Sequence, residues 1–172
     1  MTITVVSRPA RLQWRHFKAV AHLPGGDDEE AQTSSEIILP NRLSPRKVDG
    51  QFRLGDFTMT VGIKAHETVV VRTANKTDDL LDHEQGHFDL LVLVARAEKA
   101  DLEKVTASSL GELQEAVSAI QSTHDTRAQE LDAKYDEQTD HSRNQSQQRR
   151  WRKLIDDALA KEGVTSLDGN DL

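Results

Sequence analysis

Hydrophobic and polar residues alternate with a period of two along part of the first seventy residues. Between Phe57 and Ile63 every second residue is apolar, while Thr58 and Thr60 occupy the opposite face. This alternation is typical of a half-buried β-strand. The run Val69-Val70-Val71 follows after a short polar break, so we expect the two segments to form a β-hairpin. Two earlier runs rich in β-branched and aromatic residues predict further strands at 3–6 and within 12–20.

After residue 75 the apolar residues recur at helical spacing instead. Thr77 followed by Asp78 and Asp79 is a typical helix start, because a hydroxyl caps the first turn and acids favour the positive end of the helix dipole. Steps of three and four residues between apolar side chains then continue for most of the remaining chain. The pattern predicts three helices, over about 78–105, from 109 to about 135, and over about 145–161.

Strands that come first and helices that come later predict an α+β fold rather than alternating βα units. We therefore expect a twisted, antiparallel-rich N-terminal sheet followed by three long helices. The chain has 172 residues and no internal repeat, which suits a single domain over residues 1–163. Gly163 ends the last helix, and residues 164–172 are expected to form a disordered tail.

Composition narrows the classes of function. A formal net charge of −7 argues against nucleic acid as the main partner. No apolar run reaches the roughly 20 residues that a membrane-spanning helix needs. The absence of cysteine excludes thiol nucleophiles and cysteine-ligated zinc. The first residues lack the pattern of a secretory signal, which predicts a cytoplasmic location, or a periplasmic or secreted one if the natural N-terminus was trimmed.

One segment before residue 31 is expected to be a solvated loop. Pro24-Gly25-Gly26 is followed by Asp27, Asp28, Glu29 and Glu30, which combine turn formers with like charges and offer nothing to bury.

The candidate chemistry lies in the first predicted helix, at His83-Glu84-Gln85-Gly86-His87. Two histidines four residues apart share a helix face and can bind one metal ion together. In this H-E-x-x-H arrangement, Glu84 can reach a water held by the metal and act as general base without being a ligand. Gly86 costs on the order of 1 kcal/mol relative to alanine inside a helix, so close approach of substrate or backbone is expected there.

A catalytic zinc ion needs a third protein ligand, and spacing leaves several candidates open. The segment 135–141 is the densest downstream cluster of ligand-type side chains, with His141 as the imidazole and Asp136 as the carboxylate candidate. His124 is a further candidate, although it falls on an apolar stripe, where a hydrogen-bonded core histidine is the commoner outcome. Four glutamates could also serve, but each is more typical of a solvated helix charge: Glu98, Glu103, Glu112 and Glu115.

Several of these motifs resemble one bacterial family, that of predicted secreted zinc-dependent proteases, long catalogued as a domain of unknown function. The resemblance rests on HEQGHFD at 83–89, YDEQTDH at 135–141, the pair Gln148 and Trp151, and an L-x-W-x-x-F opening at 12–17. These matches extend over most of the chain.

The resemblance implies a zincin-like fold, a bound zinc ion and hydrolysis of a peptide or protein substrate. Carried over by position, it implies that His83, His87 and His141 are zinc ligands and Glu84 is the base. Tyr135 would donate a hydrogen bond to the oxyanion, a role that suits a phenol. It also implies that Asp89 or Asp136 orients a ligating imidazole.

A second hypothesis treats the chain as a non-catalytic metal-binding or protein-interaction module that retains the fold. Its support is the low aromatic content of 4% and the long charged helices, which could offer an interaction face. The position of residues 135–141 relative to the two motif histidines distinguishes the two hypotheses.

Overall fold

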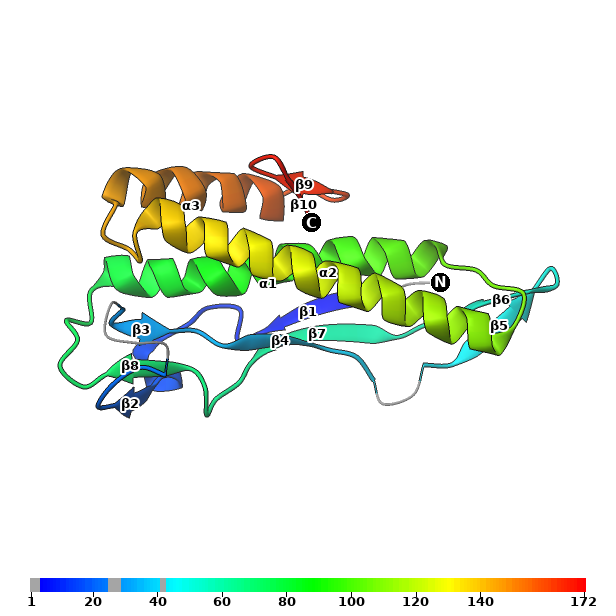
Figure 1. Ribbon diagram of the computed structural model, residues 1–172, viewed down its shortest axis with the longest axis horizontal. Helices are drawn as coiled ribbons and strands as arrows, with labels where there is room; N and C mark the ends of the chain where they lie inside the picture. The colour runs from blue at the N-terminus through cyan, green and yellow to red at the C-terminus, as the bar shows by residue number, and fades with distance from the viewer. Residues whose placement is uncertain (1–3, 25–28, 41–42) are drawn as a thin grey trace.

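The structure, a computed structural model, describes residues 4–24, 29–40 and 43–172 and has the predicted α+β organisation (Figure 1). The strands of the first half are β1 (Thr4–Arg8), β2 (Lys18–Val20), β3 (Ala31–Gln32), β4 (Ser35–Ile38), β5 (Pro45–Val48), β6 (Gln51–Leu54), β7 (Thr58–Ile63) and β8 (Val69–Val71). The helices that follow are α1 (Asp78–Lys104), α2 (Leu110–Thr139) and α3 (Gln145–Leu159). A short 3-10 helix, η1 (Trp14–His16), precedes β2.

The strands form several small sheets rather than one. One sheet has the order β1-β7-β4, a second has the order β2-β8-β3, and β5 pairs with β6 alone. Each three-stranded sheet combines a parallel pair, β1 with β7 or β2 with β8, and an antiparallel pair. The predicted hairpin of β7 and β8 is therefore wrong, because each of these strands is the central strand of its own sheet and pairs with earlier segments of the chain.

The helix boundaries agree closely with the pattern of the sequence. At the start of α1 the Thr77 hydroxyl accepts a hydrogen bond from the Leu80 amide at 3.1 Å, as its capping role predicts. Ser109 caps α2 in the same way, accepting from the amide of Glu112 at 3.2 Å. Among the described residues, no helix is both long enough and apolar enough to span a bilayer.

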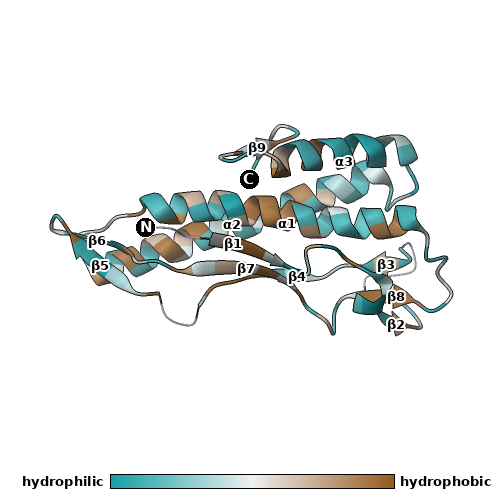
Figure 2. Ribbon diagram, turned by 180° about the vertical axis from the view of Figure 1, so that it is seen from behind, coloured by the Kyte–Doolittle hydropathy of each residue, from teal (hydrophilic) through white to brown (hydrophobic). Residues whose placement is uncertain are grey.

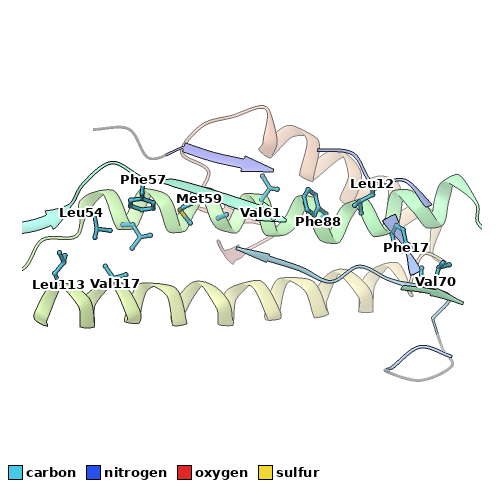
Figure 3. Packing of buried hydrophobic residues seen from close by; sticks show 14 of the residues in the cluster. Leu12, Phe17, Leu54, Phe57, Met59, Val61, Val70, Phe88, Leu113 and Val117 are labelled. Carbon is cyan, nitrogen blue, oxygen red and sulfur yellow. The ribbon is translucent and has the colours of Figure 1, made fainter. Parts of the chain in front are cut away.

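Helix α1 lies between two hydrophobic clusters. One of its sides packs Phe88 and Val92 against strand residues such as Met59 and Val61, as Figure 3 shows for part of this cluster. The other side packs against α2 and α3, where Trp151 is fully buried. Figure 2 shows the same arrangement, with hydrophobic residues gathered on α1 and neighbouring strands and a hydrophilic outer face on α3. Polar side chains of α1 that are buried in this position need specific partners.

The last residues differ from the predicted disordered tail. Strands β9 (Ser166–Leu167) and β10 (Asn170–Asp171) form a small antiparallel hairpin. The hairpin is ordered because Leu167 and Leu172 are buried in the cluster around Trp151. The Arg127 guanidinium also donates a hydrogen bond to the Leu172 carbonyl at 2.9 Å.

Candidate metal centre

A polar cavity of about 110 Å³ lies where the first turns of α1, the last turns of α2 and the segment around β3 meet. Figure 1 shows these three parts side by side near the β3 label. Among the described residues, the lining includes three histidines (His83, His87 and His141) and five acids (Glu29, Glu30, Glu84, Asp132 and Asp136). No lysine or arginine is part of this described lining.

Three ligand-type atoms converge at this cavity. His83 Nε2 lies 3.1 Å from His87 Nε2, and Asp136 Oδ1 lies 3.2 Å and 3.0 Å from these two nitrogens. Two ligand atoms bound 2.0–2.1 Å from a tetrahedral zinc ion are about 3.3 Å apart. The separations within this group are therefore close to those that a single ion requires.

Both motif histidines are oriented through their other ring nitrogen. His83 Nδ1 lies 3.2 Å from the Gln148 side-chain oxygen, and His87 Nδ1 lies 2.6 Å from the Asp132 carboxylate. Because these oxygens only accept hydrogen bonds, each Nδ1 carries a proton, which leaves each Nε2 as the ring nitrogen that can bind a metal ion beside Asp136. This is the usual arrangement around metal-binding histidines.

The pKa shifts of His87 and Asp136 indicate that positive charge is favoured between the ligand atoms of this group. Burial disfavours the charged ring of His87, but the carboxylates of Asp132 and Asp136 outweigh it and raise the pKa of His87 well above its usual value. Burial alone would raise the pKa of Asp136, yet hydrogen bonds from His83 and His87 hold that pKa well below its ordinary value. Both shifts favour a cation at this point.

Glu84 lies beside the group but is not part of it. Its side chain is 1% exposed, and its Oε2 is buried without a hydrogen-bond partner among the described residues. Burial raises the pKa of Glu84, while the charges of His87 and His83 act in the opposite direction. A buried carboxylate oxygen with free acceptor capacity, next to three convergent ligand atoms, fits the place of a base that acts on a water.

Tyr135 occupies a different place from the predicted oxyanion donor. Its hydroxyl donates to the His83 backbone carbonyl at 3.2 Å and accepts from Gln148 Nε2 at 2.9 Å, and its ring stacks on His83. Tyr135 is fully buried and is absent from the described cavity lining. This geometry does not support the oxyanion role and makes Tyr135 a residue that positions His83.

Gly86 is the residue that permits this packing. A Cβ built at Gly86 would overlap the Tyr135 hydroxyl and would lie 2.6 Å from Tyr135 Cζ. The close approach at this glycine is thus made by a side chain of α2, and not by the substrate or backbone that the sequence led us to expect.

His141 lies next to the group formed by His83, His87 and Asp136. Its Nδ1 is 3.6 Å from Asp136 Oδ1 and 3.1 Å from Glu29 Oε1. Positive φ angles at Asp140, His141 and Ser142 turn the chain after α2 and place His141 beside Asp136. Of the candidate third ligands, the structure therefore groups Asp136, rather than His141, with the two motif histidines.

The remaining candidates lie elsewhere. His124 is buried and contacts Asp101 at 3.1 Å, far along the helices from the motif. Glu98 is not a solvated charge but a buried residue, and burial together with Asp125 raises its pKa to about 7. Asp89 accepts from Gln85 at 2.8 Å and from Arg152 at 2.9 Å, so it orients no imidazole.

Sequence reasoning missed the roles of three residues. Asp132 lies one helical turn before Asp136, and Gln148 comes from another helix, so only the fold brings them to the motif. Glu29 belongs to the segment expected to be a solvated loop, yet it reaches His141; residues 25–28 of that segment lie outside the described residues. For Asp132, a signal was available in its spacing of four residues from Asp136, which puts both carboxylates on one helix face.

The fold and the group together define an α+β protein with a candidate histidine–aspartate metal centre. The chain is similar to a bacterial protein family of unknown function, DUF922, whose family model matches residues 60–142. This segment contains the motif histidines and Asp136 but neither Glu29 nor Gln148. No curated protein and no solved structure matches the chain.

Proposed function

We propose that this protein is a zinc-dependent, zincin-like peptidase. In this proposal His83, His87 and Asp136 hold the ion, and Glu84 is the general base. The observation that carries it is the convergence of three ligand atoms, 3.0–3.2 Å apart, beside a buried carboxylate oxygen without a partner among the described residues. A bound zinc ion would supply a Lewis acid that polarises the scissile carbonyl and makes water more acidic.

The chain's own residues would carry the proton. Glu84 Oε2 accepts a proton from the water as the water oxygen bonds to the carbonyl carbon. It then delivers that proton to the amide nitrogen as the carbon–nitrogen bond breaks, leaving a carboxylic acid and an amine. Asp132 and Gln148 keep the two imidazoles oriented throughout, since the side-chain oxygen of each accepts a hydrogen bond from an imidazole Nδ1–H.

A peptide substrate is favoured over a small molecule by the sheet edges near the cavity. Strands β3 and β4 each lie at the edge of their sheets, and β3 lines the cavity. An extended peptide can pair with such an edge through backbone hydrogen bonds.

A neighbouring cavity of about 230 Å³ supports the same choice of substrate. It shares Thr33, His87 and Asp132 with the polar cavity and continues along apolar residues that include Leu90 and Val94. An apolar side chain of a peptide would fit there, beside the bond to be cleaved.

Peptide cleavage and metal content, measured together, test the proposal. Purified protein is assayed on a mixture of fluorogenic peptides with apolar residues, before and after removal of metal by a chelator. We expect cleavage that is lost on chelation and restored by zinc. Glu84→Gln should lower kcat/KM by about 10²–10⁴-fold with zinc content unchanged. The exposed α1 variant Glu103→Gln is the matched control.

Two results would overturn the proposal. Undiminished cleavage by Glu84→Gln would remove the assigned base. Zinc bound by His83, His87 and Asp136 without cleavage of any peptide would instead favour the non-catalytic metal-binding module.

A further inference from the structure

A second group of ligand-type side chains adjoins the first in the same cavity. Glu29 Oε1 and His141 Nδ1 are 3.1 Å apart, and His141 Nδ1 is 3.6 Å from Asp136 Oδ1. The ligand atoms of these three residues all lie within 4.8 Å of one another. Glu29 precedes β3, whereas Asp136 and His141 belong to the end of α2 and the turn after it.

The two groups share one atom. Asp136 Oδ1 lies 3.0–3.2 Å from the two motif nitrogens and 3.6 Å from His141 Nδ1. A carboxylate in this position can bridge two ions, which two-metal hydrolytic sites hold about 3.5–4 Å apart. The ligand atoms His141 Nδ1 and Asp136 Oδ1 are both buried from solvent.

The charge of the cavity favours two ions over one. Five carboxylate residues line it, and its described lining contains no lysine or arginine. Glu84, the most deeply buried of them, has an unpartnered oxygen in addition. Solvent screens the exposed Glu30 and the half-exposed Asp132. The other three carboxylates, Glu29, Glu84 and Asp136, carry more negative charge than one divalent cation compensates, and such charge is costly where it is buried.

We propose that the protein holds two zinc ions: one on His83, His87 and Asp136, and a second on Glu29, His141 and the bridging Asp136. This inference rests on the proposed function for its first ion. The second ion has one imidazole and two carboxylates as protein ligands, a set that leaves room for water or substrate. It would also tie the segment before β3 to the end of α2.

Metal stoichiometry tests the proposal without reference to activity. Wild-type protein is dialysed against micromolar zinc, and bound metal is counted by native mass spectrometry and elemental analysis. We expect two ions per chain in the wild type and one in both His141→Ala and Glu29→Ala. The control Glu30→Ala removes a neighbouring cavity carboxylate outside the group and should retain two ions.

The number of bound ions in these proteins distinguishes a two-ion centre from a single-ion one. A single ion in the wild type would overturn the second site. Loss of all metal in His141→Ala would also overturn it, because His141 would then be a ligand of a single shared ion. Two ions in both Ala variants would also overturn it. Wild type without zinc would overturn the proposed function as well. His141 and Glu29 are partly exposed, so we expect their alanine variants to fold, and thermal unfolding of each variant checks this.

Discussion

Replacing Gly86 with alanine tests the packing that holds the candidate centre together. Alanine is favoured over glycine in a helix interior by about 1 kcal/mol, so propensity alone predicts that Gly86→Ala is stabilising. The structure predicts the opposite, because the new methyl group would overlap Tyr135. Tyr135 has no room to move, since it stacks on His83 and contacts the buried Trp151 edge-on.

The magnitude follows from the contacts that would be lost. Overpacking a close-packed site costs about 1–3 kcal/mol. Displacing the Tyr135 hydroxyl also weakens two buried hydrogen bonds, to the His83 carbonyl and from Gln148, worth about 1 kcal/mol each. After subtraction of the propensity gain, we expect Gly86→Ala to lower the free energy of unfolding by about 2–4 kcal/mol. A domain of this size would then lose roughly 2–4 °C in Tm for each kcal/mol.

Gly111→Ala is the matched control, because it changes a helical glycine of α2 with free space around it. The nearest atom to a Cβ at Gly111 is the Ser109 hydroxyl oxygen at 4.0 Å. We expect this variant to be as stable as the wild type or up to about 1 kcal/mol more stable. Urea unfolding of the three proteins gives the comparison. Equal or higher stability of Gly86→Ala would refute the reasoning, since it would mean that Tyr135 does not lie against α1.

Three further predictions concern other parts of the molecule. Burial raises the pKa of Glu98 to about 7, so ionisation of Glu98 destabilises the fold as the pH rises from about 4.5 to 7. Over that range the free energy of unfolding of Glu98→Gln should increase by up to about 3 kcal/mol relative to that of the wild type. An equal difference between the two proteins in urea unfolding at pH 5 and at pH 8 would disprove this. Gln148→Ala should weaken zinc binding by about 10–100-fold in a competition titration, whereas exposed Arg149→Ala should leave it unchanged. Leu167→Ala should cost about 2–5 kcal/mol in urea unfolding, while no loss would indicate a disordered tail.

The helical half of the fold could be predicted from the sequence because its signals are local. Thr77 and Ser109 mark helix starts by capping, and apolar steps of three and four residues continue to the helix ends. The strand partners could not be predicted in the same way. Alternation shows that Phe57–Ile63 is a strand, but its pairing with β1 depends on contacts between residues more than fifty positions apart.

The residues of the candidate site also differ in whether local sequence signals could predict them. His83, Glu84 and His87 share one helix, so their spacing alone predicts that they act together. Asp136 and His141 are only five residues apart. Which of them lies closer to the motif histidines depends on the left-handed turn after α2, which the sequence spacing does not reveal. Glu29 looked like a loop charge, because the sequence does not show that this segment returns to the end of α2.

The hydrogen bond between His83 and Gln148 connects the candidate centre to α3. Since a free imidazole and a ligated one differ in how firmly they hold that proton, occupancy of the centre and docking of α3 are thermodynamically linked. Zinc that binds only the docked form stabilises it by RT ln(1 + [Zn]/Kd). Amide hydrogen exchange along α3 should therefore slow as the centre fills, which makes a helix outside the family-matched segment a reporter of what happens within it.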